Sequence, residues 1–249
     1  MASSPVASPV RLQCQGILFD MDGILISSVG SVERSWSKWA RLRGIDPGYA
    51  CRMAHGRRAI ETVARLRPDL DSAAEVNVIE EIELADGEGM AVLPGVRELL
   101  AALCRKGETG VRWTVVTSAS ERLARRRLEW SGLALPERFV HAGCVREGKP
   151  HPAPFLAGAA LLGFDPRQCV VFEDAPSGVQ AGRAAGCTVV ATTFSHSADA
   201  LAGADYLIED LTGVAVTFLP AGQGLQLEFT PLPAVSSPAR DHSIRGTGR

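Results

Sequence analysis

The strongest signal in the sequence is the run Gly16-Ile17-Leu18-Phe19-Asp20-Met21-Asp22-Gly23. Its first four residues are apolar or lack a side chain, which is typical of a buried parallel strand. Asp20 therefore stands at the carboxyl end of a strand, where open α/β sheets bind their ligands. Asp22 follows where Gly23 permits a sharp turn. Two carboxylates this close repel each other unless a cation or a shared proton lies between them. Taken alone, the run fits a strand followed by an acidic turn as well as it fits a site.

The composition is that of an ordinary globular protein. Of the 249 residues, 46% are hydrophobic and 22% are charged, and the net charge is -2. This charge provides no basic surface for nucleic acid, and no stretch reaches the ~20 apolar residues of a membrane span, so we expect neither partner. The six cysteines lack the Cys-x-x-Cys spacing of a zinc site. They fall mostly in apolar runs, which predicts buried, reduced thiols and a cytoplasmic location; we also expect a monomer.

Residues 30–89 interrupt the alternation of strands and helices that the rest of the chain shows. Apolar residues spaced three or four apart predict helices over 31–44, 57–66 and 72 to about 87, with a turn at 46–48. Such a block cannot be a single crossover helix, so we interpret it as an inserted all-helical cap domain. Trp36 and Trp39 lie on an apolar stripe, which favours the core of the cap over a platform for a sugar.

On both sides of this block, residues 11–29 and 90–230 show strands alternating with helices. Short apolar runs predict strands near 16–20, 111–117, 139–142, 169–172, 188–191 and 205–208. Helical spacing predicts helices near 95–106, 119–130, 152–162 and 176–185. This alternation predicts an α/β fold with a Rossmann-like parallel sheet and helices on both faces. A terminal hairpin is expected from 214–218 and 225–229.

Three segments are interpreted as surface or disordered chain. Residues 1–10 and 231–249 are rich in proline and small or polar residues and cannot bury enough apolar surface to fold, so we expect them to be disordered. The N-terminal segment lacks a signal-peptide pattern, and a transit peptide stays open. The run Arg125-Arg126-Arg127 lies on a predicted helix and is interpreted as a solvated face, with a phosphate-binding patch as the alternative.

Polar groups also follow two later strands and occupy one loop. Ser118 and Ala119 come between a strand and a helix, where a hydroxyl and backbone N–H groups form a small anion site, although Ser118 alone is typical of a helix N-cap. Lys149 stands in a turn and is followed by Pro150 and Pro152. Glu173 and Asp174 directly follow an apolar strand, and uncompensated charge there is unfavourable.

Together these groups supply several carboxylates, one hydroxyl and one ammonium at one edge of the predicted sheet. Carboxylates with open coordination positions suit Mg²⁺, which retains waters and binds substrate phosphate. Mg²⁺ and a lysine offset the repulsion between a phosphate and a carboxylate nucleophile. A second carboxylate can protonate the leaving oxygen and then deprotonate water. The pattern therefore predicts phosphoryl transfer.

This arrangement resembles the haloacid dehalogenase-like superfamily of phosphatases. The resemblance covers about residues 16–208 and rests on the Asp20 run, the Ser118 strand end, Gly148-Lys149-Pro150 and Glu173-Asp174. It implies Asp20 as nucleophile, Asp22 as general acid and base, and Ser118, Ala119 and Lys149 as phosphate ligands. It also implies Mg²⁺ on Asp20, Asp174 and the Asp22 carbonyl, with Glu173 acting through water.

A second set of residues is similar to the fungal-type glycerol-phosphate and 2-deoxyglucose-6-phosphate phosphatases. It comprises Ala54-His55-Gly56-Arg57-Arg58, Gly148-Lys149-Pro150-His151-Pro152 and the run from Val171 to Gly178. The resemblance implies a small phosphorylated sugar or polyol as substrate, and we expect His55 and Arg58 to face the cleft. Ile24 and Ser27-Ser28 depart from the family pattern.

Two alternatives to a phosphatase stay open. A sugar-phosphate mutase of the same fold typically has a histidine in the first cap helix, where this chain has Val32. A catalytically silent binding protein would have no reason to retain the acidic cluster. The sequence therefore predicts a Mg²⁺-dependent phosphatase that acts through an aspartyl-phosphate intermediate.

Overall fold

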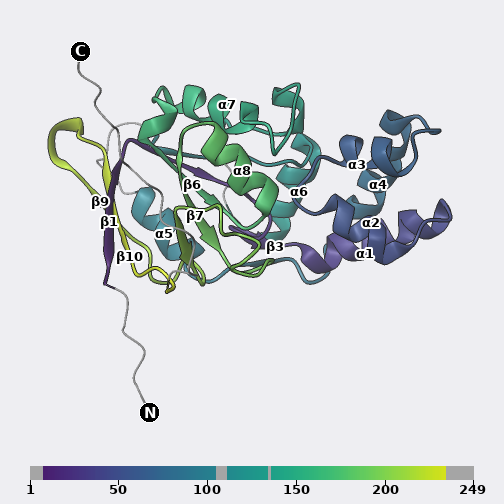
Figure 1. Ribbon diagram of the computed structural model, residues 1–249, viewed down its shortest axis with the longest axis horizontal. Helices are drawn as coiled ribbons and strands as arrows, with labels where there is room; N and C mark the ends of the chain where they lie inside the picture. Colours follow the sequence, from purple (N-terminus) through teal and green to yellow (C-terminus); the bar gives the residue numbers. More distant parts are fainter. Residues whose placement is uncertain (1–7, 105–110, 134–135, 234–249) are drawn as a thin grey trace, which may run out of the picture.

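The computed structural model describes residues 8–104, 111–133 and 136–233, and its centre is a five-stranded parallel sheet (Figure 1). The strand order is β5-β2-β6-β7-β8. The strands are β2 (Gly16–Phe19), β5 (Trp113–Val115), β6 (Cys169–Glu173), β7 (Thr188–Thr192) and β8 (Tyr206–Ile208). All neighbouring pairs are parallel, so the predicted α/β fold is confirmed.

Helices cover both faces of this sheet because both faces of its strands are apolar. Successive side chains of a strand point to opposite faces. Ile17 and Phe19 pack with α5 (Val96–Leu103) and α6 (Glu121–Ser131), whereas Leu18 packs with α7 (Ala153–Leu162) and α8 (Pro176–Ala184). The two resulting cores explain why β2 is apolar throughout.

The predicted terminal hairpin is present as β9 (Ala215–Phe218) and β10 (Leu225–Phe229), which are antiparallel. The sequence analysis missed β1 (Val10–Cys14), which pairs with β10 to complete a three-stranded sheet. Val10 therefore lies in a strand and not in a disordered N-terminus. Most of the two segments expected to be disordered lies outside the described residues.

The inserted helices form a block with its own core at one end of the molecule (Figure 1). They are α1 (Val29–Leu42), α2 (Pro47–Ala54), α3 (Ala59–Leu66) and α4 (Ser72–Leu84), called the helical block below. Trp36 and Trp39 are buried in its core, as predicted. The two chain crossings into the block pair as antiparallel strands β3 (Ile26–Ser27) and β4 (Ala91–Val92).

Two local predictions were wrong, one alternative is excluded, and one prediction is tested only in part. Residues 46–48 are not a turn: Asp46 caps α2 by accepting the N–H of Tyr49, and Pro47 is the first helical residue, a position that proline favours. Residues 139–142 form no full strand, since only Val140 makes a bridge, to Val116. The N-cap of α6 is Ser120 and not Ser118. Helix α5 ends at Leu103, and the residues 105–106 that were expected to continue it lie outside the described part of the chain.

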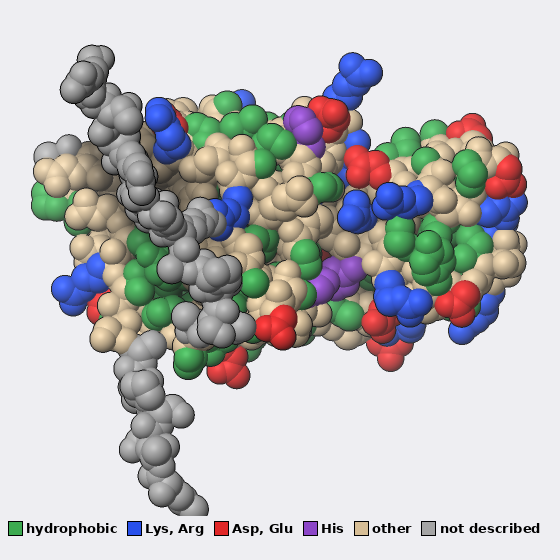
Figure 2. Space-filling view, in the orientation of Figure 1, with side chains coloured by type: hydrophobic (Ala, Val, Ile, Leu, Met, Phe, Trp, Pro, Cys, Tyr) green, Lys and Arg blue, Asp and Glu red, His purple; other side chains and the backbone are tan. Residues whose placement is uncertain are grey.

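The six cysteines differ in how far they are exposed, and the charged side chains are mixed at the surface. Cys14, Cys169 and Cys187 are buried as expected, but Cys104 and Cys144 are exposed, and all six cysteines are free. On the face shown in Figure 2, basic and acidic side chains are interspersed over the helical block. Among the described residues, no helix combines the length and the apolar character that crossing a membrane requires.

Candidate active site

The strand order brings three of the predicted segments to one edge of the sheet. Asp20 follows β2, which lies between β5 and β6. Phe19 is in register with Val115 of β5 and with Phe172 of β6. The residues that follow these three positions must therefore emerge side by side, although they are far apart in the sequence.

Lys149 lies at the centre of the site with 2% of its surface exposed. Its ammonium donates to Asp20 Oδ1 at 2.5 Å, to Glu173 Oε1 at 2.7 Å and to the carbonyl oxygen of Val116 at 3.1 Å. Burial by itself would lower the pKa of this lysine, but the two carboxylates outweigh it and raise the pKa. Lys149 is therefore a permanent cation whose three donors are all used.

The carboxylates of Asp20, Glu173 and Asp174 are buried and converge. One oxygen from each lies within 4.8 Å of the others. Burial raises the pKa of Asp20, and the charges of Glu173, Asp174 and Asp22 raise it further, against the opposing effect of Lys149. Three buried carboxylates exceed what one ammonium neutralises, and their all-oxygen donor set is the kind that Mg²⁺ prefers. These residues therefore fit a hard divalent cation.

Glu173 is oriented by the backbone that follows it. Its Oε2 accepts the N–H groups of Asp174 at 2.8 Å and Ala175 at 2.9 Å, while Oε1 contacts Lys149. The first turn of α8 passes so close that a Cβ at Gly178 would lie 1.7 Å from Glu173 Oε1. Glu173 therefore has little freedom to move and acts as a fixed bridge between Lys149 and the end of β6.

Asp22 contacts an arginine that the sequence analysis placed on the surface. Arg125 and Arg126 are exposed and pair with Glu121 and Glu129, but Arg127 is buried. Arg127 Nη1 donates to Asp22 Oδ2 at 2.9 Å. The sequence spacing could have indicated that Arg127 is buried. Position 127 follows the buried Leu123 by four residues and so lies on the same inward face of the helix.

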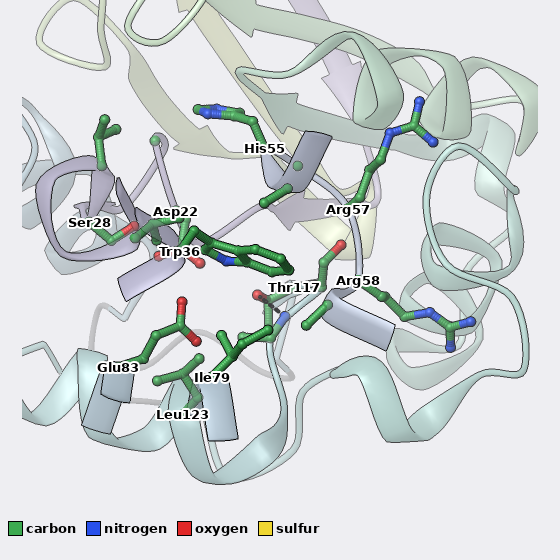
Figure 3. Close-up of a pocket in the computed structure, with 18 of the residues that line it drawn as sticks. Asp22, Ser28, Trp36, His55, Arg57, Arg58, Ile79, Glu83, Thr117 and Leu123 are labelled. Atoms are coloured by element: carbon green, nitrogen blue, oxygen red, sulfur yellow. Dashed lines mark hydrogen bonds between the residues drawn. The ribbon is translucent and has the colours of Figure 1, made fainter. Parts of the chain in front are cut away.

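His55 and Arg58 were both expected to face the cleft from the helical block, but their side chains point in different directions. His55 ends α2, and its Nε2 lies 3.9 Å from Asp174 Oδ2. The nearby Asp174 carboxylate raises the pKa of His55, against the effect of burial. Arg58 lies at the wall of the cavity, but its side chain extends away from Trp36 and Asp22 (Figure 3).

The guanidinium of Arg58 binds the loop that precedes Lys149. It donates to the carbonyl oxygens of Val145 at 3.1 Å and Arg146 at 2.7 Å, and it pairs with Glu61. These contacts join the helical block to the core and leave the guanidinium little capacity for a ligand.

At the Ser118 strand end, Ser118 lines the cavity and the N–H of Ala119 donates to Thr117 Oγ1 at 3.1 Å.

The sequence analysis missed two further residues of the site, Ser195 and His196. Ser195 Oγ donates to Asp174 Oδ2, and His196 Nδ1 lies 3.0 Å from the Asp174 carbonyl oxygen. Both follow β7 at the same edge of the sheet, which is the signal that could have found them.

A cavity of about 1090 Å³ joins these groups to the helical block (Figure 3). Asp20, Ser118, Lys149 and Asp174 contribute its polar part from the core. Val32, Trp36 and Ile79 of the block contribute an apolar part, and Trp36 thus serves both the core of the block and the cavity. This volume accommodates a small phosphorylated molecule with room for water.

The sequence is similar to a known family of hydrolases and to several phosphatases. A family model described as haloacid dehalogenase-like hydrolase matches residues 14–186, more than half of the chain. Hexitol phosphatase A of Escherichia coli (strain K12) is 42% identical over 85% of this chain and 98% of its own length. Glycerol-1-phosphate phosphohydrolase 2 of Saccharomyces cerevisiae is 33% identical over 84% of this chain and 87% of its own.

Two further similarities agree with these. The 2-deoxyglucose-6-phosphate phosphatase 2 of the same yeast is 34% identical over 80% of this chain and 89% of its own. The crystal structure of a hydrolase from Pseudomonas syringae has a TM-score of 0.71 at 24% identity, covering 80% of this chain and 94% of that one, and so shares its fold. The resemblance stated from the motifs is therefore confirmed.

Proposed function

Because the chain belongs to the haloacid dehalogenase-like hydrolase family, we propose that it is a Mg²⁺-dependent phosphatase that hydrolyses a small sugar or polyol monophosphate through an aspartyl-phosphate intermediate. The observation that carries this proposal is the convergence of Asp20, Glu173 and Asp174 around Lys149 in a buried site. A phosphate group is one of the few ligands that needs a cation and a carboxylate nucleophile at the same place.

The chemical roles follow from these positions. Asp20 attacks phosphorus, so that the Asp20 O–P bond forms as the ester P–O bond breaks. Asp22 donates a proton to the leaving oxygen and in the second half removes one from water. Ser118 binds the phosphoryl oxygens, with the backbone at Ala119 beside it, and Lys149 exchanges one of its three protein acceptors for a phosphoryl oxygen. Asp20, Asp174 and the Asp22 carbonyl would hold Mg²⁺, with Glu173 acting through water; the ion supplies positive charge against that of the phosphoryl group.

The substrate class rests on the cavity and on the relatives. Three of these relatives are named as phosphatases of a hexitol, glycerol or deoxyglucose phosphate. The helical block, which we interpret as the cap predicted over 30–89, supplies Val32, Trp36 and Ile79 where the carbon chain of the substrate would lie. It would choose among leaving groups, while the core handles the phosphate that all of them share.

The cellular compartment of the enzyme is also part of this proposal. Free thiols at the exposed Cys104 and Cys144 are compatible with a reducing compartment, so we propose that it works in the cytoplasm. The expectation of a monomer stays a prediction.

The test is a screen for inorganic phosphate release from sorbitol 6-phosphate, glycerol 1-phosphate, 2-deoxyglucose 6-phosphate and glucose 6-phosphate. We expect at least one polyol or sugar phosphate to be hydrolysed, with activity lost in EDTA and restored by Mg²⁺. No release from any ester would contradict the proposed activity, and activity indifferent to chelation would contradict the assignment of the metal. Conversion of glucose 6-phosphate to glucose 1-phosphate without phosphate release, monitored by chromatography of the same reactions, would instead indicate a mutase.

A further inference from the structure

A triad of charged residues, two of them buried, connects Asp22 to the helical block. Arg127 of α6 donates from Nη1 to Asp22 Oδ2 at 2.9 Å and from Nη2 to Glu83 Oε1 at 3.0 Å. Arg127 is 4% exposed and Glu83 is 6% exposed. The three residues come from the loop after β2, from a core helix and from α4, so one guanidinium joins three separate elements.

The two oxygens of Asp22 have different surroundings. Oδ2 is held by Arg127, whereas Oδ1 is buried and has no hydrogen-bond partner among the described residues. A buried carboxylate oxygen without a partner is unfavourable, so such atoms are retained where a ligand completes them. Asp22 lines the cavity with 27% of its side chain exposed, so a bound substrate can reach its carboxyl group.

Glu83 brings a negative charge from the helical block into this interior. Its burial raises its pKa, and Arg127 is the cation that opposes this effect. The contact between Glu83 and Arg127 exists only while α4 lies against α6, because the two residues belong to different elements. The placement of the block and the orientation of Asp22 therefore depend on the same guanidinium.

We propose, on the basis of the phosphatase function above, that Arg127 is a positioning residue that holds Asp22 through Oδ2 and so orients its carboxyl group toward the leaving oxygen, and that Glu83 couples this orientation to closure of the helical block. When the ester P–O bond breaks, the carboxyl proton of Asp22 passes to the leaving oxygen while the Asp20 O–P bond forms. In this role Arg127 acts through Asp22 and transfers no proton itself.

The variant Arg127→Lys tests the positioning role, because a lysine keeps the charge but lacks the planar fork that reaches two carboxylates. Alkoxide leaving groups need a proton, whereas p-nitrophenolate leaves without one. We expect kcat for the best polyol phosphate to fall about 10- to 100-fold with KM within about twofold. The pre-steady-state burst of p-nitrophenolate from p-nitrophenyl phosphate should change less than about threefold.

The variant Glu83→Gln tests the coupling, because it keeps the shape of the side chain and removes its charge. A block that closes less readily lowers the population of the binding-competent state and raises the apparent dissociation constant. We expect KM to rise about fivefold for both esters, while kcat changes less. We therefore expect Arg127→Lys to lower mainly kcat and Glu83→Gln to raise mainly KM.

Arg126→Lys is the matched control, since Arg126 lies on the same helix but is exposed and pairs with the exposed Glu129. It should leave all constants unchanged. Should Arg127→Lys fail to fold, the double variant Arg127→Met with Glu83→Leu removes both buried charges and permits the same comparison of esters.

Three results would overturn one or both parts of the inference. Equal losses in the burst and in steady-state hydrolysis of the polyol phosphate would indicate a structural role only, and unchanged kinetics in Arg127→Lys would indicate no role. Unchanged KM in Glu83→Gln would remove the coupling. A wild-type enzyme that hydrolyses neither ester would overturn the proposed function and this inference together, whereas an active wild type with any of the other results would overturn the inference alone.

Discussion

Gly23 packs directly against Asp174: a Cβ atom at position 23 would lie 1.8 Å from Asp174 Oδ2. Gly23 also has a φ angle of 86°, in the left-handed region that side chains disfavour. The loop that contains Asp22 can therefore approach the end of β6 only because this position has no side chain. The contact determines how closely the first and last acidic segments of the site meet.

Gly23→Ala should abolish phosphatase activity, because its methyl group would displace the Asp174 carboxylate from the metal-binding cluster. Gly44→Ala is a matched control: Gly44 has a φ angle of 68°, but nothing lies within 4 Å of its Cβ position. Both variants should lose about 1 kcal/mol or more of unfolding free energy from backbone strain. Urea unfolding and phosphate release measured on both variants check this, and full activity in Gly23→Ala would contradict it.

Asp20→Asn should reduce phosphate release by at least about 1,000-fold, because an amide cannot attack phosphorus as a carboxylate does. Its stability should change little. Burial and neighbouring carboxylates already raise the pKa of Asp20 and so disfavour its charged form, while the amide keeps a similar volume. We expect the melting temperature to shift by no more than about 4 °C, equivalent to ~1 kcal/mol.

Asp199→Asn, at an exposed position, is the control for this substitution and should alter neither quantity. Substantial activity in Asp20→Asn would remove Asp20 as the nucleophile. A collapse of stability in that variant would show instead that the charge of Asp20 is needed for folding.

Glu75 should make the helical block sensitive to acid. It is buried and accepts from Arg43 at 2.7 and 2.9 Å and from Trp39 Nε1 at 2.7 Å. The bond to Arg43, and then that to Trp39, lowers its pKa below 4.5 in the folded protein, against the effect of burial. Since the folded-state pKa is lower than the unfolded one, this stabilisation is present above about pH 4.5 and is lost as the pH falls through the folded-state pKa.

Glu75→Gln should therefore lower the unfolding free energy by about 2 kcal/mol at pH 7 and by less at pH 3.5. Glu129→Gln, which removes an exposed ion pair with Arg126, should have an effect within about 0.5 kcal/mol at both pH values. Urea unfolding at the two pH values makes the comparison. A difference between Glu75→Gln and wild type that did not shrink in acid would rule out the carboxylate as its origin.

The cysteines should divide into two reactivity classes. Burial raises the pKa of Cys14 and Cys187 to about 12 and that of Cys169 to about 11, so their reactive thiolates are scarce at pH 8. Cys104 and Cys144 are exposed. Iodoacetamide should label the exposed pair within minutes in the native protein and the buried three only in urea, as read by mass spectrometry of peptides. Native labelling of Cys14 at the rate of Cys144 would contradict the packing of β1.

Much of the fold could be predicted because its signal is local. Apolar runs identified the five strands of the parallel sheet to within a few residues, and helical spacing identified most helices. Two elements were missed for different reasons. β1 has the alternation of a half-buried strand, with Arg11 and Gln13 between apolar residues, but it is only five residues long and follows a segment expected to be disordered. Helix α2 was hidden by Pro47 and Gly48, which are typical of turns and also of a helix start.

In the candidate site, too, some residues could be predicted from the sequence and others could not. Asp20, Ser118 and Glu173 were identified from their places at strand ends, because the carboxyl ends of parallel strands must meet at one edge. Arg58 was expected to face the ligand, but the carbonyl oxygens of the loop before Lys149 attract its guanidinium. Whether a charged side chain near a site turns toward it depends on what else it can reach, which local sequence does not contain.

The order and kinds of residues along this chain were enough to predict the strands of the sheet and the polar residues at their carboxyl ends, since each of these depends on neighbours within a few positions. The burial of Arg127 between Asp22 and Glu83 was decided only by the packing of α4 against α6. Arg127 is 105 residues from Asp22 and 44 from Glu83. A charge is stable inside a protein only where distant parts of the chain supply its partners, and those partners become neighbours only when the chain is folded.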